Sequence, residues 1–277
     1  MNSALMNDEL DGKHGVQSLE VGMSILRAMV SGKRSMMLKD IAQAADMPPS
    51  KAHRYLVSLI RSGLVEQDRL TSRYDLGPFA LNLGLVALDR VDRIRLGLAA
   101  ISELRDLTNE TVSLAVWSER GPVVVRWERP RRPITVNVLT GTHLSLLGSA
   151  AGRVFAAWLP EQQTDALLRQ EIESGKLSTP IASLEEARRL LADVRAQGLA
   201  IISKGYFARG VEAAAGPVFN FKNEINMSIA VVGVEGSLDL DPDGPTLTAL
   251  KRACAELSIR LGSTAAGANL GNEGAEP

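Results

Sequence analysis

The segment LKDIAQAADMPPSKAHRYLVSLIRSGLVEQDRLTSRYDL, residues 38–76, contains two helical patterns, a proline break and an alternating hairpin. Apolar residues in 38–45 recur at the i, i+3, i+4 and i+7 spacing of an amphipathic helix. Residues 46–49 interrupt that helix, because proline cannot continue a helix but is well placed to begin one. A second helix is predicted over 50–62, ended by Gly63, which suits a left-handed C-terminal turn. Two helices joined by so short a turn are typical of the helix-turn-helix motif.

The second predicted helix has one apolar face and one polar face. Its expected inward stripe comprises Ala52, Leu56, Leu59 and Ile60. The side chains expected on the outward face near its N-terminus are Ser50, Lys51, His53 and Arg54. The N-terminal residues of a recognition helix contact base edges in the major groove, so these four are the candidate DNA-binding residues.

An alternating pattern follows the second helix. Residues 64–67 and 73–76 alternate apolar and polar side chains around a polar connector, which predicts a hairpin, or wing. Arg69 and Arg73 flank its tip and are expected to contact phosphate or the minor groove. From Lys33 to Arg73, eight basic residues stand against four acidic ones, a net charge of +4, whereas the whole chain carries −1. The positive charge is local, as expected for phosphate contact, with an ordinary solvated helix face as the alternative.

One more helix is predicted before this motif, beginning with Ser18 as its N-cap. Its expected buried stripe comprises Leu19, Met23, Leu26 and Val30. The DNA-binding core would then contain three helices. Residues 1–15 are polar and without a period, and we expect them to form a disordered tail.

Several segments resemble the isocitrate lyase regulator (IclR) family of bacterial transcription factors. They are VQSLE at 16–20, SKAHRYLVSLIRSGLVEQD and RYDLG in the motif above, GTHLSLLGSAAGRVFAAWLP at 141–160, and GVEAAAGPVFNFKNEINMSIAVVG at 210–233. The resemblance covers about residues 16–262, in the family's order. It implies an α+β protein with a winged helix-turn-helix domain, a linker helix and a C-terminal effector-binding domain similar to the GAF/PAS sensor folds. It also implies homodimers, often paired into tetramers.

The composition is that of a globular protein. A length of 277 residues allows two domains with their own cores, and 45% of the residues are hydrophobic. The single cysteine, Cys254, excludes an internal disulfide framework and fits a reducing compartment. No apolar run reaches the ~20 residues that span a bilayer, and the N-terminus lacks the apolar core of a signal peptide. We therefore expect a cytoplasmic protein without a membrane partner.

The expected layout is a DNA-binding domain at 16–78, a linker helix at 79–92, an effector-binding domain at 93–264 and a disordered tail at 265–277. Two apolar lines predict helix from 79 to about 108: Leu81, Leu85 and Leu88, then Ile94, Leu98, Ile101 and Leu104. The charged run 89–93 between them predicts a bend. The first line either packs within the DNA-binding domain or forms a self-association seam, which is what the family resemblance implies.

The second domain mixes strand and helix patterns. Strands are predicted at 112–117, 123–127, 135–139, 199–203, 213–219 and 226–232, with Gly121 and Pro122 as a hairpin turn. Helices are predicted at 149–159, 161–173, 184–197 and 243–261. A sheet with mostly local connections and flanking helices favours an α+β fold over a doubly wound parallel sheet. Cys254 lies on the apolar stripe of the last helix, so it is expected in the core rather than as a nucleophile.

The pattern that best predicts a ligand site lies at 140–152. A glycine-containing loop leads into a helix whose first turn is Ser149-Ala-Ala-Gly152, so unpaired N–H groups and the helix dipole would favour a carboxylate. Tight helix–sheet packing would explain the small residues equally well. In the resembled family this loop and helix start line the effector pocket. The resemblance thereby implies contacts from Gly141, Thr142, Leu144, Ser149, Ala150 and Ala151, with Ser203, Ala213, Ala230 and Val232 on the opposite walls.

The chain departs from the family pattern at these walls. Members that bind small polar acids tend to have an acidic residue near Ser203 and hydroxyl groups near Ala230 and Val232. The family also usually has proline where Ser145 stands. The apolar groups favour a larger, more apolar carboxylate, such as an aromatic acid, over a two- or three-carbon acid.

No pattern in the sequence predicts an enzyme. His14, His53 and His143 lack the spacing of a metal site, and there is no nucleophile elbow, Walker loop or dinucleotide fingerprint. We expect no cofactor and no metal. Lys204 and Arg209 could supply a counter-charge to the effector, although surface positions would also explain them. The alternatives are a DNA-binding module carrying a catalytic or purely structural second domain, and a DNA-binding assembly protein that takes no ligand.

The predicted mechanism is linkage between effector and double-stranded DNA. A dimer would hold two recognition helices one or more helical turns apart, so the operator should be a near-palindrome. Effector binding would change the pose of the domains through the bend at 89–93. The size of that change is limited by the ligand's differential affinity for the two poses.

Overall fold

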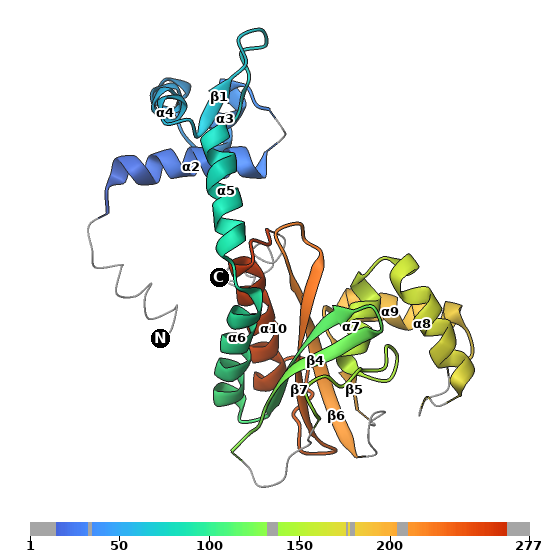
Figure 1. Ribbon diagram of the computed structural model, residues 1–277. Coiled ribbons are helices and arrows are strands. Elements are labelled where there is room, and N and C mark those ends of the chain that lie inside the picture. The colour runs from blue at the N-terminus through green and yellow to red at the C-terminus, as the bar shows by residue number, and fades with distance from the viewer. Residues whose placement is uncertain are drawn as a thin grey trace. The chain divides into compact units, whose positions relative to one another are not determined.

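The computed structural model describes residues 15–32, 35–131, 138–175, 177, 181–203 and 210–264, with the backbone alone for Leu88. The chain divides into two compact units, Met1–Val91 and Asp92–Pro277, each with a hydrophobic core (Figure 1). Outside the described residues lie most of the N-terminal tail, the tail 265–277, and Lys33, Arg34, Lys204 and Arg209.

The N-terminal unit packs helices α2 (Gln17–Ser31), α3 (Leu38–Ala44) and α4 (Pro49–Arg61) around one core. Strands β1 (Val65–Gln67) and β2 (Tyr74–Leu76) pair antiparallel and form the wing. The buried side chains meet in one cluster, which comprises Ile25, Met29, Met36, Ile41, Ala42, Ala52, Leu56, Val65 and Tyr74. The winged helix-turn-helix prediction is confirmed.

The turn between α3 and α4 is closed by its backbone. Asp46 has a left-handed φ of 49°, and the N–H of Met47 donates to the carbonyl of Ala42 at 2.9 Å. Pro49 begins α4, where an N–H group would have no helical acceptor. Gly63, at a φ of 72°, follows the end of α4. The proline and glycine positions therefore set the ends of α4, as the sequence predicts.

Helix α2 buries a different face from the predicted one. Its buried residues are Gly22, Ile25, Ala28 and Met29. The expected stripe is instead largely exposed, at 65% for Leu19, 41% for Met23 and 60% for Val30, and Leu26 is half-buried. The predicted N-cap is also wrong, because Val16 occupies the N-cap position and no side chain caps the helix. The helix carries apolar residues on two neighbouring faces, and periodicity alone does not tell which one packs.

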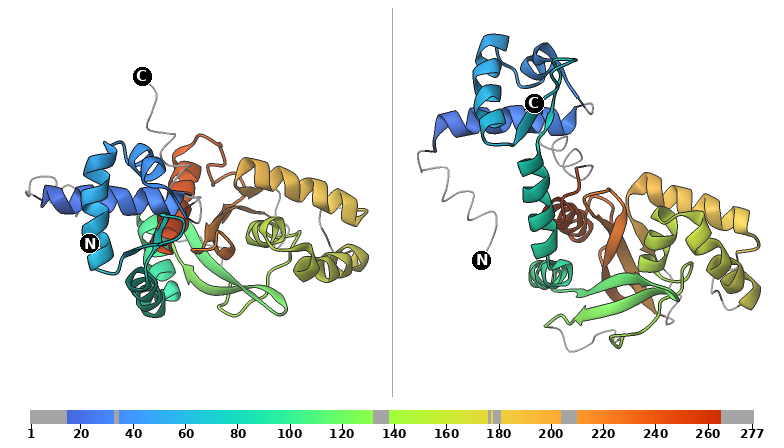
Figure 2. Two further views of the ribbon diagram at one scale, coloured as in Figure 1. Left: turned by 90° about the horizontal axis from the view of Figure 1, so that it is seen from above. Right: turned by 45° about the horizontal axis from the view of Figure 1, so that its top comes forward.

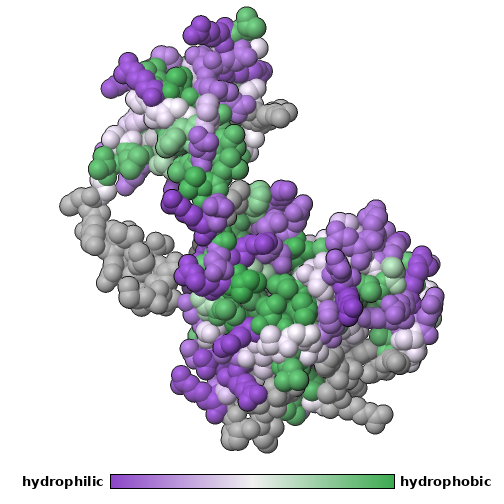
Figure 3. Space-filling model, in the orientation of Figure 1, coloured by the Kyte–Doolittle hydropathy of each residue, from purple (hydrophilic) through white to green (hydrophobic). Residues whose placement is uncertain are grey.

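Helix α5 (Pro78–Arg90) exposes most of its apolar side chains. Phe79, Leu81, Leu83, Leu85 and Val86 are 46% to 64% exposed, and hydrophobic side chains gather over this helix in Figure 3. Leu81 and Leu85 are therefore not packed into the core of the N-terminal unit, which removes one of the two explanations of this apolar line.

The C-terminal unit is an antiparallel sheet with helices on both faces (Figures 1 and 2). The strand order is β4-β3-β7-β6-β5, for β3 (Thr111–Ser118), β4 (Gly121–Glu128), β5 (Ala200–Ile202), β6 (Val211–Phe219) and β7 (Ile225–Val234). Helices α6 (Arg93–Thr108) and α10 (Pro245–Arg260) cover one face. Helix α7 (Ala150–Trp158) covers the other, with α8 (Glu161–Ser174) and α9 (Leu184–Gln197) beside it. The α+β prediction is confirmed.

Alternation along β7 assigns its side chains to the two faces. Met227 lies against α6, where a Cβ on Gly97 would come within 3.2 Å of its sulfur. Ala230 and Val232 belong to the buried cluster under α7. Cys254 on α10 is 4% exposed, and burial raises the pKa of its thiol to about 12. A thiol so protonated is a core residue rather than a nucleophile, as predicted.

The hairpin turn between β3 and β4 differs from the prediction. Gly121 and Pro122 begin β4, and Gly121 pairs with Ser118, so residues 119–120 form the turn. Proline at the start of a strand forgoes only a hydrogen bond that a strand end can spare. A turn is therefore present in this region as predicted, but it lies at 119–120, just before Gly121 and Pro122.

The strand predicted at 135–139 is not found in its described part, 138–139. Residues 141–144 lie beside β4 instead. The N–H of Gly141 donates to the carbonyl of Val124 at 2.7 Å, and the N–H of Leu144 donates to the carbonyl of Pro122 at 2.8 Å. These bonds fix the loop that leads to α7.

Candidate functional site

Four of the candidate DNA-binding residues lie together on the outward face of α4. Ser50, Lys51, His53 and Arg54 are all exposed. Ala52 and Leu56 on the opposite face are 0% exposed, so burial of the inner stripe turns the cationic residues outward. Lys51 and Arg54 form no ion pair with another residue that the structure describes. Their charges are therefore available to phosphate.

The tip of the wing is shaped by one aspartate. Asp68 Oδ1 accepts hydrogen bonds from the N–H groups of Leu70 at 2.7 Å and Thr71 at 2.8 Å. The bonds from Thr71 and Leu70 lower the pKa of the Asp68 carboxyl. Arg69 is exposed at this tip, and Leu70 beside it is 96% exposed. Leu70 is not among the predicted DNA-binding residues, although it is an apolar residue inside a polar connector.

Arg73 differs from Arg69 in having an intramolecular partner. Its Nη1 donates to the carbonyl of Ser35 at 3.1 Å. Beside this bond, Met36 and Tyr74 exchange two backbone hydrogen bonds of 3.0 and 2.8 Å. Arg73 thus ties the wing to the segment before α3, a role that the sequence analysis did not predict.

The predicted effector residues fall into a buried group and a more exposed group. Ala150, Ala151, Ala230 and Val232 are buried in one cluster, and Leu144 and Ala213 pack against it. Ser203 and Gly141 are exposed, Thr142 and Ser149 are half-buried, and none of these four belongs to the cluster. The structure therefore brings the start of α7 and the predicted sheet wall together.

The start of α7 supports both explanations of its small residues. Ser149 caps the helix, because its Oγ accepts from the N–H of Gly152 at 2.9 Å. A Cβ on Gly152 would overlap the carbonyl oxygen of Ser145, so this glycine is required by packing. Among the described residues, no acceptor is found for the N–H groups of Ala150 and Ala151. Those two remain available to an anion.

A carboxylate of the protein itself binds the loop before α7. Glu171 on α8 accepts hydrogen bonds from the N–H of Leu146 at 2.6 Å, the N–H of Leu147 at 3.0 Å and the Oγ of Ser145 at 2.8 Å. The sequence analysis missed Glu171. The available sign was Ser145, since a serine can donate this bond and the proline usual in the resembled family cannot.

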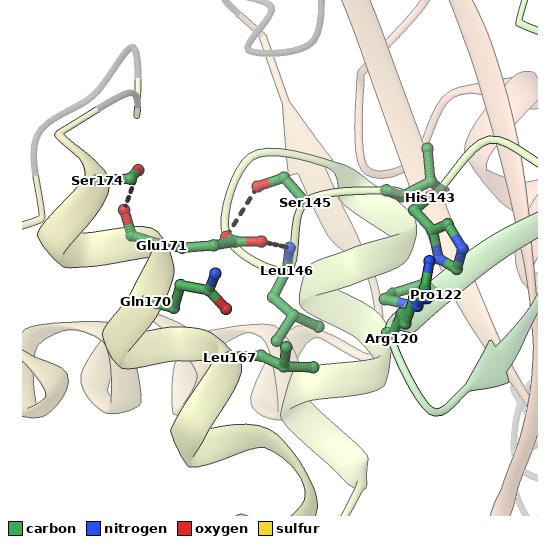
Figure 4. Close-up of a pocket in the computed structure, with 11 residues that line it drawn as sticks. Arg120, Pro122, His143, Ser145, Leu146, Leu167, Gln170, Glu171 and Ser174 are labelled. Atoms are coloured by element: carbon green, nitrogen blue, oxygen red, sulfur yellow. Dashed lines mark hydrogen bonds between the residues drawn. The ribbon is translucent and has the colours of Figure 1, made fainter.

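A pocket of about 320 Å³ lies between α8 and the loop at 143–146 (Figure 4). Arg120 and His143 line one side of it, and Gln170 and Glu171 line the other. Of the predicted effector residues, Leu144 alone lines this pocket. None of the alanines of the buried cluster lines this pocket, although Leu146 belongs to the cluster and Leu167 packs against it.

Two negative observations hold for the described part of the chain. No group of three or more His, Cys, Asp or Glu side chains there is arranged to hold a metal ion. None of its helices is both long enough and apolar enough to span a bilayer.

Comparisons with known proteins place both units in one group. A family model described as the bacterial transcriptional regulator IclR C-terminal domain matches residues 86–259, and one described as the IclR helix-turn-helix domain matches residues 18–69. The glycerol operon regulatory protein of Streptomyces griseus is 30% identical over 258 residues, covering 90% of this chain and 97% of that protein.

Solved structures agree with this match. The crystal structure of Pseudomonas aeruginosa HmgR is similar at a TM-score of 0.79 and 38% identity, covering 90% of this chain and 99% of that one. An IclR homolog from Microbacterium hydrocarbonoxydans complexed with 4-hydroxybenzoate shares the fold at a TM-score of 0.53 and 18% identity, covering 88% of this chain and 99% of that one.

Proposed function

The chain belongs to the IclR family of bacterial transcriptional regulators, and we propose that it controls catabolic genes in response to a small carboxylate with a largely apolar body, such as an aromatic acid. Its N-terminal unit is the family's DNA-binding domain and its C-terminal unit is the family's effector domain. Like its named relatives, the protein is a transcriptional regulator and not an enzyme. We further propose that it acts in the cytoplasm as a homodimer, or a pair of dimers.

The proposed class of effector, an apolar carboxylate, rests on the apolar residues at the predicted effector site. Ala213, Ala230 and Val232 lie with Ala150 and Ala151 in one apolar cluster. These walls offer dispersion contacts and no side-chain hydrogen bond, so a two- or three-carbon acid would gain little from them. The N–H groups of Ala150 and Ala151 would receive the carboxylate at the start of α7.

Calorimetry on the full-length protein tests the effector class. We choose benzoate and 4-hydroxybenzoate against pyruvate and glyoxylate, since a relative of the same fold was solved with 4-hydroxybenzoate. The aromatic acids should bind about tenfold more tightly or better, a difference of about 1.4 kcal/mol. Tighter binding of either small acid would reject the proposal.

A matched pair of variants sharpens this test. Replacing Ala230 and Val232 by serine, A230S with V232S, adds two hydroxyl groups to the proposed wall. The double variant should lose much of its preference for benzoate over pyruvate, because the new hydroxyls reward a polar ligand. The same two changes made at Ala214 and Val231, which alternate to the opposite face of the sheet, should leave the preference intact.

The DNA-binding proposal assigns Ser50, Lys51, His53 and Arg54 to the major groove and adjoining phosphates. It rests on their common exposure on α4 and on the local positive charge. Arg69 and Arg73 would contact phosphate or the minor groove from the wing. The operator should be a near-palindrome of double-stranded DNA, which selection of bound sequences from a random pool would reveal.

A further inference from the structure

The pocket beside Glu171 is lined by polar side chains on opposite sides, with Leu146 and Leu167 between them (Figure 4). The apolar residues that line it are Pro122, Leu144, Leu146 and Leu167. Arg120 and His143 stand at one side, and Gln170 stands on α8 at the other. At about 320 Å³, the volume is at the lower end of the range of small-molecule sites, so it suits a ligand of one ring rather than two.

The side that carries the cation is held in place by the backbone. Ser118 Oγ donates to the carbonyl of Gly121 at 2.7 Å and accepts from the N–H of Arg120 at 3.3 Å, which fixes the β3–β4 turn. His143 forms an antiparallel bridge with Val123. The backbone at both residues is thus fixed before any ligand arrives, which lowers part of the entropic cost of binding one.

The two charged side chains that line the pocket, Arg120 and Glu171, differ in their partners. The two oxygens of Glu171 already accept three hydrogen bonds from the loop at 145–147, so this carboxylate is satisfied within the protein. The guanidinium of Arg120 has no ion-pair partner among the described residues. Glu119, its neighbour in the chain, does not line the pocket. An anion therefore completes the site better than a cation does.

We propose that this pocket is a second carboxylate site, separate from the effector site under α7. The carboxylate lies at Arg120 and His143, and an apolar body covers Leu146 and Leu167. A hydroxyl at the far end of the ligand reaches the amide of Gln170. The proposal does not depend on the effector class proposed above, because the two sites share Leu144 alone.

The imidazole of His143 offers a local probe of this site. The chain contains three histidines, so the imidazole carbon–proton spectrum is simple, and His143→Gln identifies the signal. Titration of the full-length protein with benzoate should move the His143 signal saturably. Acetate, which lacks the body, and benzamide, which lacks the charge, should each bind about fivefold more weakly or worse, about 1 kcal/mol.

Two arginine variants decide the assignment. Arg120→Gln removes the proposed anchor from an exposed turn and should weaken the benzoate response of His143 about tenfold. Arg169→Gln removes the same charge from α8 outside the pocket and should leave the response unchanged. A His143 signal that does not move, an equal response in Arg120→Gln, or equal binding of benzamide would each overturn the proposal. Benzoate bound at either site contributes heat in the calorimetric test, so the variants separate the two proposals: A230S with V232S changes only the effector site, and Arg120→Gln changes only this pocket.

Discussion

Glu171 concentrates three hydrogen bonds on one half-buried carboxylate, and two of the donors are backbone N–H groups of the loop that leads into α7. Hydrogen bonds to a charged group contribute about 1.5–3 kcal/mol. Glu171→Gln removes that charge and turns an NH₂ group toward donors. We expect a loss of about 2 kcal/mol in the free energy of unfolding, measured by denaturant titration.

Glu173→Gln is the control for this change. Glu173 is exposed on the same helix, so its replacement should alter stability by less than about 0.5 kcal/mol. Equal stability of the two variants would show that the Glu171 contacts contribute little.

The hydrogen-bond partners of Glu171 could not be predicted from the sequence. Its donors lie 24 to 26 positions away, so no local periodicity connects them. The exposed residues of α4 could be predicted because the helical period itself separates Lys51 and Arg54 from Ala52 and Leu56. Local patterns predict which side of a helix a residue occupies. Contacts between residues that are distant in the sequence can be identified only from the structure.

The arginines of the DNA-binding unit should act in different ways. Arg54→Ala should relax sequence preference, since its position on α4 is suited to base edges. Arg69→Ala should weaken binding to all sequences alike and flatten the salt dependence of binding by about one unit, because it removes one phosphate contact. Fluorescence anisotropy over a range of salt concentrations, on specific and scrambled DNA, measures both effects.

Arg189→Ala is the control, since Arg189 lies on α9 in the other unit. A salt slope in Arg69→Ala equal to that in Arg189→Ala would remove Arg69 from the phosphate contacts. For Arg73→Ala we expect a mixed result, because its tether to Ser35 couples the charge to the position of the wing.

At the scale of an element, the wing depends on the ionised form of Asp68. Its pKa is lowered below the ordinary value of 3.8 by hydrogen bonds from Thr71 and Leu70. A carboxyl with a lowered pKa stabilises the folded state at pH values above its unfolded pKa, and this contribution is lost as the pH falls through the folded value. The wing tip should therefore loosen below about pH 4, and not between about pH 5 and 8.

Amide exchange at Leu70 and Thr71 measures this effect. Exchange there should rise relative to the rest of the N-terminal unit as the pH falls below 3.8. In Asp68→Asn, which does not titrate, the relative rates should stay constant. A parallel rise in the variant would assign the loosening to another group.

Helix α5 exposes two leucines of its apolar line. Leu81 and Leu85 are 64% and 54% exposed in the single chain, which is costly for leucine unless another surface covers it. We expect a second copy of α5 to cover them. Leu81→Asp with Leu85→Asp should shift the protein from dimer to monomer in sedimentation velocity at micromolar concentration. Leu70→Asp, at a more exposed leucine of the wing, should keep the dimer.

Helix α2 also has an exposed apolar face, which the sequence pattern wrongly predicted to be buried. Leu19, Met23 and Val30 have the spacing of a core stripe and yet are exposed, while the smaller Gly22 and Ala28 pack inward. A buried stripe and an association surface have the same composition and period, so the sequence shows that a face is apolar without showing what covers it. The bounds of α9, in contrast, agree with the predicted range 184–197, and the structure shows Ser183 capping its start and Gly198 its end.

At the scale of the whole molecule, the break between α5 and α6 is the covalent route from one unit to the other. Helix α5 ends at Arg90, and α6 begins at Arg93 with Asp92 as its N-cap, whose Oδ1 accepts from the N–H of Arg95 at 3.0 Å. The run 89–93 predicted this break, because it is charged and separates the two apolar lines. We propose that effector binding is coupled to DNA binding through this junction.

Coupling of this kind is reciprocal, which makes it measurable from both ends. If the effector changes operator affinity by a factor, the operator must change effector affinity by the same factor, typically about 5- to 150-fold. Asp92→Ala removes the cap of α6 and should reduce that factor while leaving each single affinity unchanged. Ser183→Ala removes a cap of the same kind from α9, within the C-terminal unit, and should leave the factor intact. Because both variants lose a comparable amount of helix stability, about 0.5–2 kcal/mol, an equal factor in the two would exclude the junction as the route of coupling.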